Sequence, residues 1–429
     1  MSKRYQRSEE LLEVALKTIP LGSQTFSKSK TQFPHGASPF FMSKGKGSHV
    51  WDVDGNEYID FINSLAAVTL GYNDTDVTTA VKEQLEEGVL FSLPHPIEMK
   101  VAEKICEMVP CAEMVRFGKN GSDATSAAVR LARAYTGREH IIVCGYHGWQ
   151  DWYIGSTPRD LGVPQATKEL THTFSYNDLD SLNEIFKMWP DQIAAVIMEP
   201  MNVVDPQAGF LEGVKKTAHN NGAILIFDET ITGFRFSNGG AQELFGVTPD
   251  LATFGKGIAN GFAVSAVTGK KEIMKLMEYI FFSSTFGGET ISLAASLATM
   301  NKLQQEPVIA TMIKQGERII KFLQDLIAEY DAKHIFSVSG HPVWSFLLIK
   351  DVAPYTQWQI KTLFMQEMLA RGILILGTHN MSYSHSDSDL DSLFEAYQEV
   401  IPLLVKAIHE NTLEKLLHCQ TLEHLFKVR

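Results

Sequence analysis

The chain has 429 residues and a formal net charge of −12, and 45% of its residues are hydrophobic and 21% charged. This composition is typical of a globular protein with enough apolar material for a buried core, and the length allows two or three domains. The acidic balance argues against a general nucleic-acid binder, because such proteins need a basic face.

The N-terminal part of the chain is polar. Residues 1–10 contain no apolar segment of the kind that marks a signal peptide. Pro20–Ser48 is rich in Ser, Lys and Gly and predicts irregular or short-strand structure that could wrap over a site or a partner subunit. Further along, apolar runs such as Ala194–Met198 are too short to cross a bilayer. The cysteines are scattered without a CxxC pair, so we expect a cytoplasmic protein with no membrane partner.

From about Asp76 onward, helical spacing alternates with short apolar runs. Helices are predicted over Val77–Glu87, Glu98–Met108, Ser122–Tyr135, Leu179–Trp189 and Val214–His219. The short apolar runs, most of them predicted strands, are Met114–Phe117, Ile141–Cys144, Ile193–Met198, Ala223–Phe227, Leu251–Phe254 and Val264–Val267. Because the runs do not alternate apolar with polar residues, they predict a mainly parallel central sheet flanked by helices on both faces.

After about Leu293 the pattern becomes mostly helical, with short strands predicted at Ile335–Val338 and Val343–Ile349. The leucine spacing of Thr412–Phe426 predicts a surface helix at the tail. We therefore expect an α/β protein with a smaller α+β C-terminal lobe. The predicted domains are an N-terminal arm or small-lobe segment (1–75), a large domain (76–300) and a C-terminal small domain (301–429).

Several familiar site motifs are missing. The sequence has no complete phosphate loop, no HExxH and no Gly-x-Ser-x-Gly elbow. His418, Cys419 and His424 could suggest a metal site, but they lie on the predicted tail helix without a matching carboxylate. We predict no metal site.

An acid and a lysine follow two of the predicted strands. Asp228 ends the run Ala223–Phe227, and Lys256 comes shortly after Leu251–Phe254. Ligands of parallel α/β sheets bind beyond the carboxyl ends of the strands, so both residues are predicted to face one crevice. A pyridoxal 5'-phosphate (PLP) enzyme needs a lysine for a Schiff base and an acid against the pyridine nitrogen. Taken singly, Asp228 could equally be a helix cap or loop acid, and Lys256 a solvated loop lysine.

Two further segments suit the same cofactor. Gly121 and Ser122 begin a predicted helix, where Gly121 lets the backbone approach a phosphate and Ser122 could cap the helix and donate to it. Tyr146 follows the strand Ile141–Cys144 and could stack on a pyridine ring. A plain helix cap at Ser122 and a core or loop aromatic at Tyr146 remain open alternatives.

From about Leu12 to Pro402 the chain resembles the class III (subgroup II) aminotransferases of PLP fold type I, within them the glutamate-1-semialdehyde aminomutase-like branch. One motif alone is weak, but the ordered set is specific. The motifs are Trp51–Asp60, Asn120–Ala124, Arg130–Arg138, Tyr146–Gly148, Glu199–Pro200, Asp228–Arg235, Gly255–Gly257 and Ser284–Gly288.

The resemblance implies a role for each matching residue. Lys256 would form the Schiff base and shuttle a proton, and Asp228 would hold the pyridine nitrogen. Gly121 and Ser122 would bind the phosphate, and Tyr146 would stack on the ring. Thr285 would reach the phosphate of a neighbouring subunit, which implies a homodimer with shared active sites. Glu229, next to Asp228, is expected to be structural.

The chain also departs from the aminomutase pattern. Lys28 stands where those enzymes have an arginine thought to hold the substrate carboxylate, and Leu65 aligns with an aromatic of their pocket. Glu289 replaces the asparagine of a Gly-Asn-Pro motif, and we expect its carboxylate to repel a dicarboxylate-like substrate near the pocket mouth.

These departures favour an aminotransferase that moves an amino group from an amino-acid donor to a carbonyl acceptor. The variants are similar to those of relatives encoded among surface-polysaccharide genes, so the acceptor could be a keto or aldehyde sugar. One alternative is a glutamate-1-semialdehyde 2,1-aminomutase that forms 5-aminolevulinate by intramolecular transfer. An alternative of another class is a non-catalytic scaffold with the PLP fold.

Overall fold

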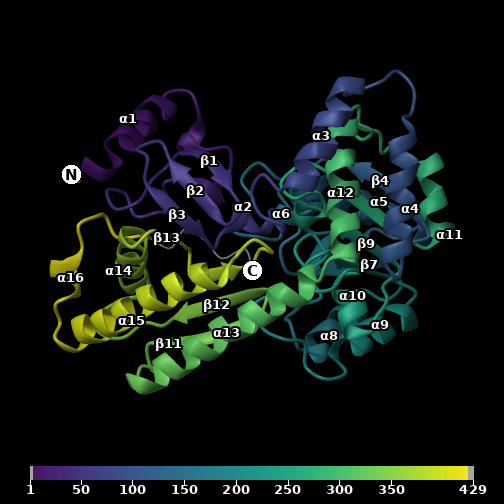
Figure 1. Ribbon diagram of the computed structural model, residues 1–429. Helices are drawn as coiled ribbons and strands as arrows, with labels where there is room; N and C mark the ends of the chain where they lie inside the picture. Colours follow the sequence, from purple (N-terminus) through teal and green to yellow (C-terminus); the bar gives the residue numbers. More distant parts are fainter. Residues whose placement is uncertain (1–2, 424–429) are drawn as a thin grey trace. The chain divides into compact units, whose positions relative to one another are not determined.

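The computed structural model describes residues 3–423, which form two compact units (Figure 1). The central unit comprises Thr75–Ile309, and the terminal unit combines the chain up to Asp74 with the chain from Ala310 onward. The predicted domain boundaries at residues 75 and 300 stay a prediction. Within residues 3–423, no helix is both long and apolar enough to cross a membrane.

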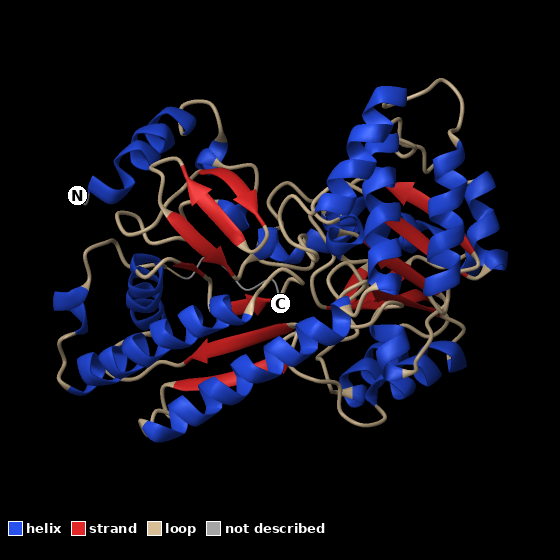
Figure 2. Ribbon diagram, in the orientation of Figure 1, coloured by secondary structure: helices blue, strands red, loops and turns tan. Residues whose placement is uncertain are grey.

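Figure 2 distinguishes the strands of the central unit from the helices around them. In the described residues of this unit the strands form a seven-stranded sheet with the order β4-β10-β9-β8-β7-β5-β6. Neighbouring strands from β9 to β6 are parallel, whereas β10 runs antiparallel to both β9 and β4. The strands are β4 Met114–Gly118, β5 His140–Cys144, β6 Thr171–Thr173, β7 Ile193–Met198, β8 Ile224–Asp228, β9 Leu251–Phe254 and β10 Ser265–Gly269. The predicted α/β class with a mainly parallel central sheet is confirmed.

Strand β10 is antiparallel because the connection from β9 is short. Only residues 255–264 join the two strands, and they hold the short helix η4 (Lys256–Ala259) and a turn at Gly261, where φ is +98°. A parallel neighbour would need a crossover of about a dozen residues or more. The chain therefore reverses directly, and Lys256 lies at the start of the reversal.

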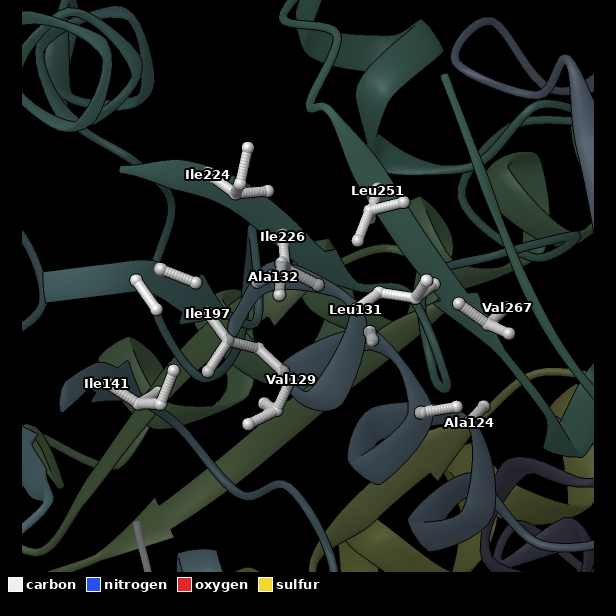
Figure 3. Packing of buried hydrophobic residues seen from close by; sticks show 14 of the residues in the cluster. Ala124, Val129, Leu131, Ala132, Ile141, Ile197, Ile224, Ile226, Leu251 and Val267 are labelled. Atoms are coloured by element: carbon white, nitrogen blue, oxygen red, sulfur yellow. The ribbon is translucent and has the colours of Figure 1, made fainter. Parts of the chain in front are cut away.

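Helices cover both faces of the central sheet. Successive residues of a strand point to opposite faces, so the side chains of both sets are buried under helices. The helices of this unit are α3 Thr75–Glu87, α4 Pro96–Met108, α5 Gly121–Thr136, α6 Asp151–Ile154, α7 Gln165–Lys168, α8 Leu179–Met188, α9 Phe210–Asn220, α10 Ala241–Phe245, α11 Lys271–Met274 and α12 Thr290–Gln305. Ile141 and Ile226 pack in one cluster with the alanines of α5 (Figure 3). Ile142 and Leu225 pack on the opposite face with residues of α8 and α9. This two-sided burial explains why the strands are apolar at consecutive positions.

The terminal unit is built from both ends of the chain. In its described residues, one sheet has the order β1-β2-β3-β13, in which β13 from the C-terminal part pairs parallel with β3, and an antiparallel sheet has the order β11-β12-β14. Strands β11 and β12 match the two strands predicted there. The elements are α1 Gln6–Ala15, β1 Met42–Lys46, β2 His49–Asp52, β3 Glu57–Asp60, α2 Asn63–Ala66, α13 Val308–Glu329 (which begins in the central unit), β11 Phe336–His341, β12 Trp344–Ile349, α14 Gln357–Ala370, β13 Ile373–Leu374, β14 Thr378–Asn380, α15 Asp387–His409 and α16 Leu413–Leu416.

The predicted tail helix over Thr412–Phe426 is wrong for most of its described part. Helix α16 ends at Leu416, residues 417–423 are not helical, and residues 424–426 lie outside the described residues. Side chains of α14 accept hydrogen bonds from backbone N–H groups of this segment instead. Gln366 Oε1 accepts from the His418 N–H at 2.8 Å, and Thr362 Oγ1 accepts from the Leu422 N–H at 2.9 Å.

Candidate active site

Asp228 and Lys256 lie at the same edge of the central sheet, as the strand pattern predicts. Asp228 is the last residue of β8 and pairs in register with Thr253 of the parallel neighbour β9. Lys256 follows β9 after one glycine and begins η4 with a φ of +40°, an uncommon value for a residue with a side chain. Such a conformation persists only where the surrounding structure holds it, and it is frequent at functional sites.

The Asp228 carboxylate is buried but surrounded by donors. His147 Nδ1 lies 2.8 Å from Oδ2, and the hydroxyls of Thr230 and Thr253 donate to Oδ1 at 2.6 and 3.1 Å. Burial by itself raises the pKa of Asp228, but the contacts with His147 and Thr230 outweigh it and hold the pKa below its ordinary value. Asp228 is therefore an ionised carboxylate at the strand end, suited to a ligand group that carries a positive charge.

His147 is a site residue for which the sequence predicts a place near the pocket but neither a role nor a partner. Because an ionised carboxylate only accepts hydrogen bonds, Nδ1 is the donor in this contact. Nε2 is buried and has no hydrogen-bond partner among the described residues. The Tyr146–Gly148 motif pointed to this stretch, but the partnership with Asp228 spans 81 positions of the chain. An unsatisfied buried nitrogen beside an ionised acid is unusual in a folded protein and is consistent with a group that contacts a ligand.

Gly121 and Ser122 form the first turn of α5, close to both Asp228 and Lys256. A side chain at residue 121 would place its Cβ 3.1 Å from Thr230 Cγ2, and one at residue 255 would place it 3.8 Å from the Gly121 Cα. The helix start therefore lies tightly against Thr230 and in van der Waals contact with the segment that leads to Lys256. The N-terminus of the 16-residue helix also offers the unpaired N–H groups that bind phosphates.

The prediction that Ser122 caps this helix is wrong. Asn120 is the N-cap residue, and Asp123 Oδ2 accepts the backbone N–H groups of Lys119 and Asn120 at 3.0 and 2.8 Å. Ser122 is the second residue of the helix, and its Oγ lies 3.4 Å from the Trp149 N–H. Capping by a neighbour leaves the Ser122 hydroxyl available as a donor to a ligand.

Tyr146 lies in the loop after β5, and Glu199 holds that loop. Glu199 Oε2 accepts the Tyr146 N–H at 3.0 Å and the Asn202 amide at 2.6 Å. Gly145 has a φ of +109°, and any Cβ there would come within 2.5 Å of the same carboxylate oxygen. The Tyr146 ring meets Tyr153 edge-on at a centroid distance of 5.6 Å. The backbone of Tyr146 is thus fixed by a buried acid at the end of β7.

Thr285 does not contact the other predicted cofactor-binding residues. It lies exposed in a turn before α12, and no hydrogen bond within the described residues joins it to the other predicted site residues. The side chains of Tyr279, Phe281 and Phe286 in the same stretch are also exposed. The resemblance assigned Thr285 to a neighbouring subunit's site, and that assignment stays a prediction.

Two acids have structural partners. Glu229 is fully buried and accepts the Ala241 and Gln242 N–H groups at 2.7 and 2.9 Å, which fits its expected structural role. Glu289 caps α12 and pairs with Lys119 Nζ at 2.8 Å. The expectation that Glu289 repels a dicarboxylate substrate stays a prediction, and it is weakened because a cation and a helix N-terminus already compensate the charge of Glu289.

No cluster of three or more potential metal ligands among His, Cys, Asp and Glu occurs within residues 3–423. His418 and Cys419 are part of this described range, whereas His424 lies outside it.

Comparisons with known proteins agree with this geometry. The family model described as Aminotransferase class-III matches residues 32–401. A 3-aminobutyryl-CoA aminotransferase of Cloacimonas acidaminovorans is 35% identical over 94% of this chain and 99% of its own length. A glutamate-1-semialdehyde 2,1-aminomutase of Syntrophobacter fumaroxidans is 36% identical over 91% and 96%. The FumI protein of Sphingopyxis sp. MTA144, solved in its PLP internal aldimine form, superposes with a TM-score of 0.87 at 27% identity, over 96% of this chain and 100% of that one.

Proposed function

The chain belongs to the class-III aminotransferase family of PLP enzymes, and we propose that it moves an amino group from an amino-acid donor to a separate carbonyl acceptor. The observation that carries the proposal is the meeting of Asp228, Lys256 and the start of α5 at one sheet edge. An ionised acid, an amine and a helix N-terminus are complementary to the ring nitrogen, the aldehyde and the phosphate of PLP.

We propose the following roles for the residues that would hold PLP. Asp228 would bind the ring nitrogen, because an ionised buried carboxylate favours its protonated form. Gly121 and Ser122 would bind the phosphate with backbone N–H groups and a hydroxyl, and Tyr146 would lie against the ring. His147 Nε2 is buried and has no hydrogen-bond partner among the described residues, which fits a site that receives a ligand.

Bound PLP supplies an electron sink that stabilises negative charge on the carbon next to the transferred nitrogen. Lys256 would hold the cofactor covalently until an amino substrate binds. Once released, its ε-amine would take a proton from the substrate carbon and return one to the cofactor side, as a general base and then a general acid. Glu199 would act through Tyr146 by fixing the backbone of its loop.

We propose that two copies of the chain assemble with shared active sites, Thr285 of each copy reaching the phosphate of the other. The exposure of large apolar side chains in the central unit supports this: Leu93 is 79% exposed, and Tyr279 and Phe281 are each 83% exposed. Exposed apolar side chains of this size are typical of surfaces that bind a protein partner. A cytoplasmic location remains a prediction from the sequence.

We propose a keto or aldehyde sugar, or a similar polyol-like carbonyl compound, as the acceptor. Lys28 and Leu65 argue against glutamate 1-semialdehyde as the acceptor, since they replace the arginine and the aromatic expected for it, and the choice of a sugar rests on the likeness of these variants to relatives encoded among surface-polysaccharide genes. Glu289 no longer contributes to the argument, because Lys119 and α12 hold it.

An absorption spectrum before and after addition of L-glutamate tests the transferase proposal. A visible band that falls while a near-ultraviolet band rises would show that glutamate gives up its amino group to the cofactor. A Lys256→Ala variant serves as the control, because PLP can bind it only without the covalent link. If no band forms even after incubation with PLP, the proposal fails.

The aminomutase remains a second candidate, because the relative from Syntrophobacter fumaroxidans carries that name. The distinguishing assay supplies glutamate 1-semialdehyde without any amino donor. Formation of 5-aminolevulinate at a steady rate would establish the aminomutase and contradict the proposed transfer between two molecules. If 5-aminolevulinate does not form but sugar carbonyls are aminated with glutamate present, the transferase stands.

A further inference from the structure

Lys119 and Glu289 form an ion pair beside the candidate phosphate turn. Their Nζ and Oε2 atoms are 2.8 Å apart, and the side chains are only 18% and 14% exposed. Burial alone would raise the pKa of Glu289, but Lys119 and the Ser292 hydroxyl hold it below its ordinary value. Both side chains are largely shielded from water, unlike those of most surface ion pairs.

Lys119 is fixed at both ends. Its backbone N–H donates to Asp123 Oδ2 at 3.0 Å, and its side chain reaches Glu289. The next residues along the chain are Asn120, Gly121 and Ser122, which form the start of α5. The ion pair therefore attaches to the chain one residue before the candidate phosphate turn.

Glu289 is fixed as firmly on its side. Its carboxylate accepts the Ile291 N–H at 2.8 Å and the Ser292 hydroxyl at 2.6 Å, and so caps α12. Helix α12 packs against η4, the short helix that begins with Lys256. The turn preceding Glu289 contains Thr285, and a Cβ at Gly287 would come within 3.2 Å of the Phe117 carbonyl oxygen. The turn thus lies directly against β4.

We infer that Lys119 and Glu289 are a positioning pair that fixes the phosphate turn relative to the Lys256 helix, and that cofactor affinity depends on it. The inference rests on the proposed PLP site. The physical reason is that a partly buried charge without its partner must recover its solvation, which requires the surrounding backbone to move. That movement would separate the two parts of the site that bind the phosphate and the aldehyde.

A double-mutant cycle on PLP binding tests this. The variants are Lys119→Met, Glu289→Gln and the double variant, each prepared as the apoenzyme and titrated with PLP. Gln keeps an oxygen for the α12 N–H groups while it removes the charge. Each single variant is expected to raise the PLP dissociation constant about tenfold, equivalent to about 1.4 kcal/mol. The double variant should bind no more weakly than either single one.

A second ion pair on the same helix provides the matched control. Lys302 Nζ lies 2.7 Å from Asp76 Oδ2 and joins the other end of α12 to α3. Lys302→Met is expected to lower thermal stability but to leave PLP affinity unchanged. Lys119→Arg keeps the charge and should retain affinity, which guards against a variant that simply misfolds.

The outcomes separate the two proposals. If wild-type apoenzyme binds no PLP, the proposed function fails. If the wild type binds PLP but the Lys119 and Glu289 variants bind equally well, or their effects add in the double variant, the positioning pair is overturned. An equal loss of affinity in Lys302→Met would also overturn it, because the effect would then be one of general stability.

Discussion

His147 donates a hydrogen bond from Nδ1 to Asp228 Oδ2 over 2.8 Å, and both side chains are almost completely buried. The contact joins the loop after β5 to the end of β8, and it sets the charge state of the acid proposed to face the cofactor. It leads to two of the predictions below.

Asp228→Asn should lower kcat at least about a hundredfold, the size of effect that follows loss of one preorganised electrostatic partner. The amide has nearly the same shape but cannot balance a positive charge on the ring nitrogen. Steady-state kinetics measure the loss, and a PLP titration shows whether the cofactor still binds. A variant with full kcat would exclude Asp228 as the ring-nitrogen partner.

His147→Phe should move the acid limb of the pH–rate profile to higher pH. In the wild type the pKa of Asp228 is below its ordinary value, so its contribution is present at neutral pH and lost only in strong acid. Removal of the histidine leaves burial as the main influence, which raises the pKa. His140→Phe is the control, because His140 is also buried but lies on β5, and this variant should not change the pH of the acid limb. If the acid limb of the His147→Phe profile lies at the same pH as that of the wild type, His147 does not control the pKa of Asp228.

Lys256→Ala should abolish covalent attachment of PLP and lower turnover at least about a hundredfold, because proton transfer alone contributes that much in most enzymes. Borohydride reduction followed by peptide mass analysis would find the cofactor on Lys256 in the wild type. Lys270→Ala serves as the control, since Lys270 pairs with Asp250 away from this edge of the sheet. Label on any other lysine would refute the assignment.

Phe281→Glu should shift the protein from dimer to monomer, because it places a charge on an exposed apolar side chain of the central unit. Light scattering across a range of concentrations measures the mass. Leu161→Glu is a matched control, since Leu161 is completely exposed but outside the Tyr279–Phe286 stretch. A wild-type protein that stays monomeric at all concentrations would contradict shared active sites.

The terminal unit should lose stability below about pH 6.5, the ordinary histidine pKa. Burial lowers the pKa of His379 to about 3 and of His385 to about 4. Between those values and about 6.5 the unfolded chain binds protons that the folded unit excludes, so each histidine costs about 1.4 kcal/mol per pH unit.

Thermal unfolding between neutral and mildly acidic pH measures this slope. His409→Gln should not change it, because that histidine is exposed. A melting temperature that stays constant down to pH values near the folded-state pKa values would show that the buried histidines do not control acid stability.

The strand ends are predictable from the amino-acid sequence because buried parallel strands leave an unbroken apolar signature. The runs Ala223–Phe227 and Leu251–Phe254 are enough to locate Asp228 and Lys256 at strand ends. The helix start at Gly121 is recognisable from its local chemistry in the same way. Signals of this kind depend only on neighbouring residues.

Contacts between distant segments are not predictable in this way. His147 and Asp228 are 81 positions apart, and Lys119 and Glu289 are 170 apart, so no local pattern shows which side chains meet. The sequence therefore suggests that Glu289 is a charge facing the substrate, and it does not reveal that this residue caps a helix and has its own cation. The tail prediction is wrong for a similar reason, since Gln366 and Thr362 of α14 offer hydrogen bonds that compete with the helix suggested by its leucines.

The pairing of β13 with β3 has a consequence for how the protein is made. Strands β1, β2 and β3 belong to a sheet whose fourth strand is Ile373–Leu374, so that sheet cannot be completed until Leu374 has left the ribosome. The central unit has all of its own strands by Gly269 and can fold while synthesis continues. The N-terminal strands therefore remain without their fourth strand throughout the synthesis of the central unit.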